Sequence, residues 1–195
     1  MLVLASASPR RQELLRNASI PFVVQPTDIP EVPEAGEAAQ AFAERMARQK
    51  ALTVFRQRPH DLVLGADTIV VVDAEILGKP RDNADAARML RLLSSRRHEV
   101  TTGVCLVGQQ LGSAIFFEDV RSETTAVTMD ALGDEDIRAY ISTGEPLDKA
   151  GAYAIQGRAS RWVSRIEGDY FNVVGLPVSL VYKMLREHGV VCTKT

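Results

Sequence analysis

The sequence predicts a mixed α/β fold, and two observations lead to it. Runs rich in β-branched residues, the clearest at residues 62–72, alternate along the chain with segments whose apolar residues recur at helical spacing, the clearest at residues 38–56. The chain has 195 residues, of which 46% are hydrophobic and 25% charged, which is enough for one core or two small lobes. No domain boundary is visible, so we expect a single domain over residues 1–195.

Charge and cysteine content exclude several classes of protein. A formal net charge of −2 argues against a general nucleic-acid or membrane-surface binder, so any basic site must be local. Cys105 and Cys192 form neither a disulfide framework nor a zinc-binding pattern. The first apolar stretch is too short for a signal peptide, and no later run approaches membrane length. We expect a cytoplasmic protein with no nucleic-acid or membrane partner.

The first segment of the chain reads as a short strand, a tight bend and the opening of a helix. Ser8 is a suitable N-cap, Pro9 suits the first helical position, and Arg10 and Arg11 fall in the first turn. Cations there oppose the helix macrodipole, so with backbone N–H groups and the hydroxyls of Ser6 and Ser8 they predict an anion such as a phosphate chain. The alternative is that Ser8 only caps the helix and the arginines point into solvent.

A second strand at residues 20–24 and an acidic, proline-rich loop lead to the helical segment 38–56. Lys50 lies on the apolar stripe of that segment, four residues after Met46 and four before Val54. Such a lysine either snorkels past the edge of the core or is held for an anionic partner. The spacing leaves both possibilities open.

Asp67 interrupts the most apolar run of the chain, at residues 62–72, which reads as a buried strand pair or one kinked strand. A carboxylate buried there without a partner would cost several kcal/mol, roughly, so it needs charges or hydrogen bonds. Gly65 and Ala66 just before it are typical of a bulge or a close backbone approach that directs a side chain into a site. We favour a functional role for Asp67 over a structural one. Lys79 follows on a stiff Gly-Lys-Pro loop.

The later elements are read from the same signals. They are a helix capped by Asn83, an antiparallel strand pair at 98–107 and 114–129 joined by a turn at 108–112, a helix at 134–142, a strand at 161–166, a turn at 168–172 and a last helix starting at Pro177. Three histidines, His60, His98 and His188, have no partner at ligand spacing and are expected at the surface. The segment 145–157 packs turn residues around the opposite charges of Asp148 and Lys149, a density typical of functional loops.

Several short motifs together resemble the Maf family of nucleoside triphosphate pyrophosphatases, in that family's order and at similar intervals over nearly the whole chain. They are Ser6-Ala-Ser-Pro-Arg-Arg11, Lys50-Ala, Gly65-Ala-Asp-Thr68, Gly78-Lys-Pro80, Pro146-Leu-Asp-Lys-Ala-Gly-Ala-Tyr-Ala-Ile-Gln-Gly157 and Gly175-Leu-Pro177. One departure is visible: the family commonly has Asp-Glu in the acidic loop, whereas this sequence has Pro30-Glu31. If that loop binds a metal, it therefore has one carboxylate fewer to do so.

The resemblance implies an α/β fold of two lobes around a mixed, strongly twisted sheet, with a central nucleotide-binding cleft, as in inosine triphosphatases. It implies hydrolysis of a nucleoside triphosphate to the monophosphate and pyrophosphate, which depends on positioning and on neutralising phosphate charge. The implied residues are Asp67, Lys79, Arg11 and Lys50 for catalysis, Ser6, Ser8, Arg10, Arg11, Thr68, Lys79, Asp148, Lys149 and Gln156 for substrate binding, and Glu31 and Asp67 for a metal.

In this resemblance Asp67 is the proton acceptor that activates water, and a divalent cation, Mg²⁺ or Mn²⁺, is the expected cofactor, since Mg²⁺ binds through a few carboxylates plus substrate phosphates. We further expect a small-molecule nucleotide substrate and a homodimer.

Three positions indicate the preferred base. In the family, a dTTP/UTP group differs from a 7-methylguanosine triphosphate group at the positions of Arg10, Thr68 and Gln156. The second group is expected to have Trp, Gln and Glu at these three positions. The chain sides with the pyrimidine group at all three. The amide of Gln156 has both a donor and an acceptor for O4 and N3–H of uracil or thymine, whereas a carboxylate would have no proton for O4.

Two other functions compete with this interpretation. A non-catalytic nucleotide-binding regulator of septum formation would need the arginines but not Asp67. Another triphosphate house-cleaning enzyme, such as an inosine triphosphatase, would share the fold type but not the Ser-Pro-Arg-Arg opening or the Gln156 loop.

Overall fold

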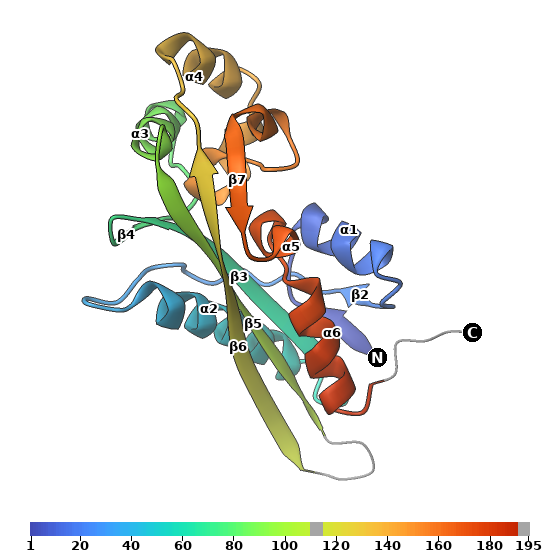
Figure 1. The fold of residues 1–195 in the computed structure, drawn as a ribbon. Coiled ribbons are helices and arrows are strands. Elements are labelled where there is room, and N and C mark those ends of the chain that lie inside the picture. Colours follow the sequence, from blue (N-terminus) through green and yellow to red (C-terminus); the bar gives the residue numbers. More distant parts are fainter. Residues whose placement is uncertain (110–114, 191–195) are drawn as a thin grey trace. The chain divides into compact units, whose positions relative to one another are not determined.

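The computed structural model describes residues 1–109 and 115–190, which form a mixed α/β fold (Figure 1). In chain order the strands and helices are β1 (Leu2–Leu4), α1 (Pro9–Asn17), β2 (Val23–Val24), α2 (Ala39–Phe55), β3 (Leu62–Val72), β4 (Glu75–Leu77), α3 (Asn83–Leu93), β5 (Arg97–Gln109), β6 (Phe116–Met129), α4 (Asp134–Ile141), β7 (Val163–Glu167), α5 (Tyr170–Val174) and α6 (Val178–Glu187). Short 3₁₀ helices lie between α4 and β7.

The strands form one seven-stranded sheet in the order β2-β1-β3-β5-β6-β7, and β4 pairs with β3. Strand β1 is parallel to both β2 and β3, with Val3 opposite Val23 and Val63. Strand β4 is antiparallel to β3, and β7 is antiparallel to β6. The sheet is therefore mixed, which confirms the predicted fold class.

The chain divides into two compact units. The first contains the described part of Met1–Asp67, Thr102–Glu123 and Gly175–Thr195, and the second contains Thr68–Thr101 and Thr124–Val174. Strands β3, β5 and β6 each have residues in both units. Asp67 is thus the last residue of the first unit on β3.

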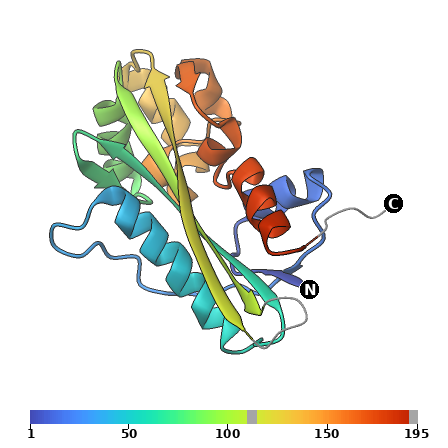
Figure 2. The same cartoon turned by 60° about the horizontal axis from the view of Figure 1, so that its bottom comes forward.

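In the first unit, α2 packs closely over the strands, as Figure 2 shows. Buried alanines on α2, with Val54, lie in one cluster with Val3, Val63 and Cys105. A Cβ at Gly65 would lie 2.2 Å from the carbonyl oxygen of Ala47 on α2. Glycine at this position of β3 is what allows helix and strand to approach so closely.

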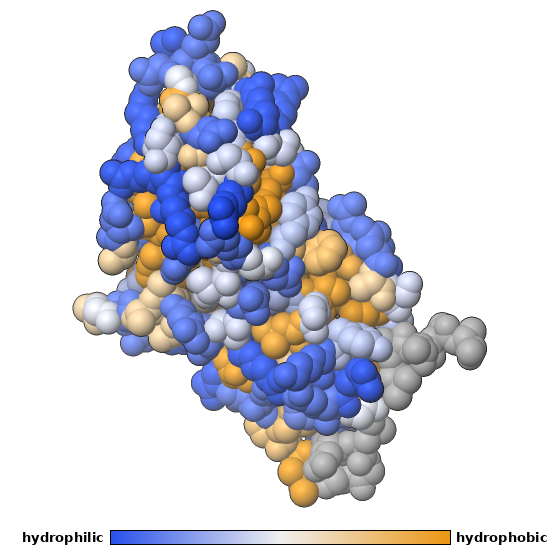
Figure 3. Space-filling view, in the orientation of Figure 1, coloured by the Kyte–Doolittle hydropathy of each residue, from blue (hydrophilic) through white to orange (hydrophobic). Residues whose placement is uncertain are grey.

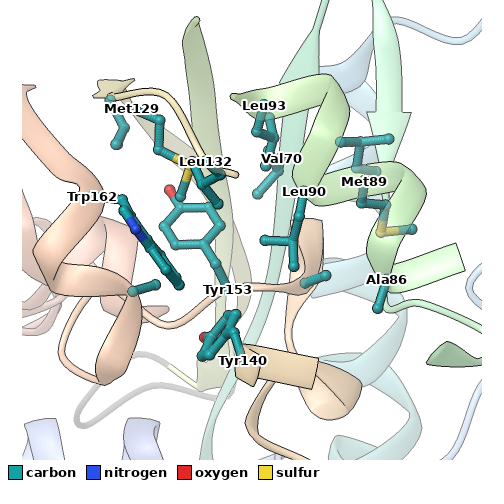
Figure 4. Packing of buried hydrophobic residues seen from close by; sticks show 14 of the residues in the cluster. Val70, Ala86, Met89, Leu90, Leu93, Met129, Leu132, Tyr140, Tyr153 and Trp162 are labelled. Carbon is teal, nitrogen blue, oxygen red and sulfur yellow. The ribbon is translucent and has the colours of Figure 1, made fainter. Parts of the chain in front are cut away.

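The second unit has the larger cluster of buried side chains, part of which is shown in Figure 4. Aliphatic side chains of α3, such as Leu90 and Leu93, pack there with the aromatic rings of Tyr140, Tyr153 and Trp162. The rings of Tyr140 and Trp162 meet edge to face, with centroids 5.4 Å apart. These side chains form the core that holds the loop 145–157.

Helices α3 and α4 are amphipathic at the surface of this unit. Each buries its apolar residues, including Met89 and Ile137, and exposes charges such as Arg91 and Asp134, which pair at 2.8 Å. The surface over these two helices is mainly hydrophilic in Figure 3. No helix of the described residues is long and apolar enough to span a membrane.

Most predicted elements are confirmed, and the differences have local causes. Residues 62–72 form one strand rather than a pair. The N-cap of α3 is Asp82, not Asn83, because the Asp82 side chain accepts from the Asp85 N–H at 2.8 Å. The predicted turn at 168–172 contains helix α5, whose start is stabilised by the Asp169 side chain accepting from the Phe171 N–H. The predicted turn at 108–112 lies largely outside the described residues, as does Cys192.

The prediction of a surface position for His98 is wrong. Its side chain is buried, and Nε2 lies 2.8 Å from the hydroxyl of Tyr153. Among the residues that the structure describes, Nδ1 has no hydrogen-bond partner. Burial lowers the pKa of His98 to about 4, so the ring is neutral at pH 7. His60 is exposed and His188 is half-buried.

Candidate active site

The N-terminus of α1 forms as predicted and holds Arg11 inside the first unit. The hydroxyl of Ser8 caps the helix by accepting from the Arg11 N–H at 3.4 Å, and Pro9 takes the first helical position. The Arg11 guanidinium is buried, and it donates to Ser6 Oγ at 3.1 Å and to the carbonyl of Gly175 at 2.8 Å. The alternative in which Arg11 points into solvent is therefore wrong.

Arg11 is also electrostatically linked to two carboxylates of the same unit. Burial lowers the pKa of Arg11, and the negative charges of Asp67 and Glu31 oppose that effect. The nearby positive charge of Arg10, a half-buried residue, lowers it further. The predicted anion-binding residues of α1 and the predicted acidic residues therefore belong to one electrostatic environment.

Lys50 stands at the centre of this environment. It lies on the buried face of α2, and its Nζ is 2.5 Å from Glu31 Oε1 and 2.6 Å from Asp67 Oδ1. Its side chain is only 9% exposed, against 39% for that of Glu31. Lys50 is thus held between two anionic partners, and the snorkelling alternative is wrong. Glu31 is an ion-pair partner rather than a purely solvated residue of the acidic loop.

The position of Asp67 on β3 accounts for its properties. The close contact of Gly65 with α2 brings β3 against the helix that carries Lys50, and the Asp67 carboxylate is buried beside it. Burial raises the pKa of Asp67, while the positive charges of Lys50 and Arg11 oppose the rise. A carboxylate with a raised pKa is a stronger base than an exposed aspartate.

The same geometry bears on metal binding. Glu31 and Asp67 direct oxygen atoms at one point, where Lys50 Nζ lies. Within residues 1–109 and 115–190, no group of three or more His, Cys, Asp and Glu side chains is placed to hold a metal ion. The two carboxylates are ligands of the type that a hard cation accepts, but the point on which they converge is occupied by the Lys50 ammonium group.

The second unit holds the other predicted substrate residues on two segments that are joined by a backbone hydrogen bond. The N–H of Gly151 donates to the carbonyl of Gly78 at 3.1 Å, which ties the exposed Lys79 loop to the segment 145–157. Lys149 pairs with Asp148, and its Nζ also donates to the carbonyl of Glu145 at 3.2 Å. Lys79, Asp148 and Lys149 therefore lie on connected loops of one unit.

Gln156 and Thr68 also belong to the second unit. Gln156 is exposed, at the tip of a turn closed by the Gly157 N–H donating to the Ala154 carbonyl at 3.0 Å. Thr68 is half-buried on β3. The roles of these residues in substrate binding stay predictions, as do those of the residues in the first unit.

Three contacts could not have been predicted from the sequence in this detail. The carbonyl of Gly175 orients Arg11, and the only signal for it was the Gly-Leu-Pro motif. The Glu145 carboxylate accepts from the Tyr140 hydroxyl at 2.8 Å and from the Arg158 N–H at 3.1 Å. No pattern in the sequence distinguished Tyr140 from an ordinary core residue.

The chain is similar to known proteins over nearly its whole length. A family model described as "Maf-like protein" matches residues 1–188. The dTTP/UTP pyrophosphatase of Koribacter versatilis (strain Ellin345) is 59% identical over 189 residues, which cover 97% of this chain and 95% of that protein. The dTTP/UTP pyrophosphatase of Symbiobacterium thermophilum is 50% identical over 189 residues, covering 96% of this chain and 94% of that protein.

Among solved structures, the chain is similar to the Staphylococcus aureus Ham1 protein. The TM-score is 0.48 and the sequence identity 14%, over 95% of this chain and 98% of that chain. A likeness of this size does not by itself establish a function.

Proposed function

Since the chain belongs to the Maf family, we propose that it hydrolyses dTTP and UTP to the nucleoside monophosphate and pyrophosphate. The observation that carries the proposal is the 59% identity, over 97% of the chain, to a protein named dTTP/UTP pyrophosphatase. The buried arrangement of Lys50, Asp67 and Arg11 supplies groups that suit this reaction.

Asp67 is the proposed general base. It takes a proton from a water molecule whose oxygen attacks a phosphorus atom of the anhydride that links the α and β phosphates. The bond from that phosphorus to the bridging oxygen breaks as the new bond forms, which releases the monophosphate and pyrophosphate. The raised pKa of Asp67 favours this role, because a stronger base accepts the proton more readily. The ion pair with Lys50 fixes the carboxylate in one orientation.

The cations neutralise charge on the phosphate oxygens during this step. Arg11, Arg10 and Lys50 supply positive charge in the first unit, together with the hydroxyls of Ser6 and Ser8. We assign Lys79 the same function in the second unit, where its loop is fixed through Gly78. Phosphoryl and nucleotidyl transfer depends mainly on such positioning and electrostatic stabilisation.

A divalent cation would have to use the carboxylate oxygens that do not bond to Lys50 Nζ, because that ammonium group occupies the point between the two carboxylates. Glu31 and Asp67 would hold it, and Mg²⁺ suits a site with few protein oxygens and several phosphate oxygens better than a soft metal does. When bound, it would supply further positive charge to the phosphate oxygens. We propose Mg²⁺ as the physiological ion, with Mn²⁺ as a substitute.

Gln156, with Arg10 and Thr68, is proposed to select the pyrimidine base. The Gln156 amide offers one donor and one acceptor to O4 and N3–H of uracil or thymine. Its exposed position at the tip of a turn leaves the amide accessible to a nucleotide. Asp148 and Lys149 are proposed to support substrate binding beside it.

A non-catalytic regulator of septum formation is not favoured by these findings. Such a protein would have no use for a buried carboxylate of raised pKa that is kept beside a lysine. We also propose a cytoplasmic location, a homodimeric state, and one functional domain over residues 1–195.

The first products decide between this reaction and its alternatives. The purified chain is incubated with Mg²⁺ and a panel of nucleoside triphosphates, and orthophosphate and pyrophosphate are quantified separately. We expect pyrophosphate as the first product, released faster from dTTP and UTP than from purine triphosphates. Orthophosphate as the first product, in a preparation free of other phosphatases, would contradict the proposal.

A further inference from the structure

Gln156 lies in a segment of the second unit whose two ends are anchored by side chains from outside it. The N–H of Ala154 donates to the Tyr140 hydroxyl at 3.1 Å, and the N–H of Arg158 donates to the Glu145 carboxylate, at 3.1 Å to Oε1 and 3.4 Å to Oε2. Gln156 is two residues from each anchor. The exposed tip is thus tied to the buried part of the unit on both sides.

The two anchors are themselves joined. The Tyr140 hydroxyl donates to Glu145 Oε1 at 2.8 Å, so it accepts from Ala154 while it donates to Glu145. Burial raises the pKa of Tyr140 above its usual value, which keeps the proton that this donation needs. The two residues thus form one hydrogen-bonded unit, here called the Tyr140–Glu145 clamp.

The clamp has a rigid base. Tyr140 is completely buried on α4, and its ring packs edge to face on Trp162 within the core shown in Figure 4. Glu145 is held through its own backbone, since its N–H donates to Thr143 Oγ1 at 3.1 Å and its carbonyl accepts from Lys149 Nζ. The clamp therefore connects the Gln156 tip to the hydrophobic core and to a second predicted substrate residue.

Gly157 leaves the space that the clamp needs. A Cβ at this position would lie 2.1 Å from Glu145 Oε1, so a larger residue would displace the carboxylate or the loop. A glycine here allows the carboxylate to approach the backbone of the tip directly.

We propose that Tyr140 and Glu145 are positioning residues for base selection, which hold the backbone of Gln156 where its amide can bond to both O4 and N3–H of a uracil or thymine ring. The inference rests on the proposed base-reading role of Gln156. Two simultaneous hydrogen bonds to a flat ring edge demand a fixed backbone, because a small displacement lengthens at least one of them. Neither residue has to touch the nucleotide.

The test compares dissociation constants for dTTP and dCTP, measured by calorimetry on the full chain in EDTA, where the proposed metal-dependent hydrolysis does not proceed. Pyrophosphate release is followed separately with Mg²⁺. Cytosine presents an acceptor at N3 and a donor at N4, the reverse of thymine. For Tyr140→Phe and Glu145→Ala we expect dTTP binding to weaken about tenfold, as for loss of one well-placed hydrogen bond, with little change for dCTP. Glu145→Gln keeps an acceptor oxygen and should recover most of the discrimination.

Tyr153→Phe is the matched control, because it also removes a buried hydroxyl, one that is bonded to His98 and not to the tip. It should leave the ratio of the two constants unchanged. In a Gln156→Ala background, Tyr140→Phe should have no further effect on the ratio, since residues that act through one another are not additive.

Unchanged ratios in Tyr140→Phe and Glu145→Ala would overturn the inference, as would a Tyr140→Phe effect of full size in the Gln156→Ala background. Neither result depends on turnover. If the wild-type chain binds dTTP selectively and releases no pyrophosphate, the proposed reaction is wrong, and the ratios still test the clamp.

Discussion

The two units bury polar groups in different ways. The first unit buries charges: Lys50 pairs with Asp67 at 2.6 Å, and Arg11 is buried in the same electrostatic environment. The buried polar groups of the second unit are mostly neutral, with His98 held in its uncharged form against the Tyr153 hydroxyl; its buried carboxylate, Asp85, pairs with the exposed Arg88. Buried charges are the more costly arrangement, since desolvation of an ion is opposed only by well-placed partners.

The two kinds of buried group indicate different roles. Apolar residues of similar size could replace a buried ion pair with little loss of stability, so its retention beside a predicted anion site indicates a function. Neutral hydrogen-bonded groups such as Tyr140 fix the geometry of a loop without a large desolvation cost. Removing a buried charge from the first unit should therefore cost more stability than removing a neutral hydrogen bond from the second.

The largest effect is expected from removing the proposed base. Asp67→Asn keeps the shape of the side chain but cannot accept a proton, so kcat for dTTP should fall by about 10²–10⁴-fold. The dissociation constant for dTTP should stay equal or decrease, because one negative charge near the phosphates is lost. Steady-state kinetics and calorimetry on the same preparation measure both quantities. A variant with wild-type turnover would show that Asp67 is structural and that another group acts as the base.

Lys50→Met should have the next largest effect, now on stability. It leaves the Asp67 and Glu31 carboxylates without their shared cation, and breaking such a buried pair costs about 3 kcal/mol. The pKa of Asp67, already raised, should rise further, so the variant binds a proton when folded and its deficit should grow with pH. Urea unfolding at several pH values measures this.

Two further variants make the Lys50 test specific. The double variant Lys50→Met with Asp67→Asn should regain part of the lost stability, because the unpaired charge is gone. Tyr153→Phe in the second unit removes only a neutral hydrogen bond and should cost about 1 kcal/mol, with no such pH dependence. A Lys50→Met deficit no larger than this would contradict the contrast between the two units.

Much of the first unit could be predicted because its signals are local. Ser8 and Pro9 specify the start of α1 by capping chemistry, and a carboxylate within an apolar run marked Asp67. The sequence could not decide whether Lys50 snorkels, since that depends on Glu31 and Asp67, which are 19 and 17 residues away in the chain. Such pairings are set by packing and not by periodicity.

In the second unit, the sequence showed a dense loop but not what holds it. The anchor between Arg158 and Glu145 joins residues 13 positions apart, and the pairing of His98 with Tyr153 spans 55. Histidine alone carries no sign of burial, so a surface position was the expected one, and a tyrosine at an apolar helix position reads as core whether or not its hydroxyl has a partner. The proposed role of Tyr140 depends on its hydroxyl oxygen, which the hydrophobic pattern does not reveal.

The last effect concerns His98 and the stability of the second unit in acid. Its pKa is about 4 when folded, against an ordinary value of 6.5, so between these two pH values the unfolded chain binds more protons. The stabilisation that comes from keeping His98 neutral is fully present above pH 6.5, declines as the pH falls, and is gone below about pH 4. The loss amounts to at most about 3 kcal/mol, from 1.36 kcal/mol for each unit of pKa.

His98→Gln isolates this contribution, because its amide can still bond to the Tyr153 hydroxyl but does not titrate. We expect the free energies of unfolding of wild type and variant, measured in urea from pH 8 to pH 4, to separate as the pH falls below about 6.5, because only the wild type loses stability there. All other titrating groups are common to both proteins and cancel in the difference. Parallel curves would mean that His98 binds a proton as easily in the fold as outside it, and the contrast between charged and neutral burial would then not extend to this residue.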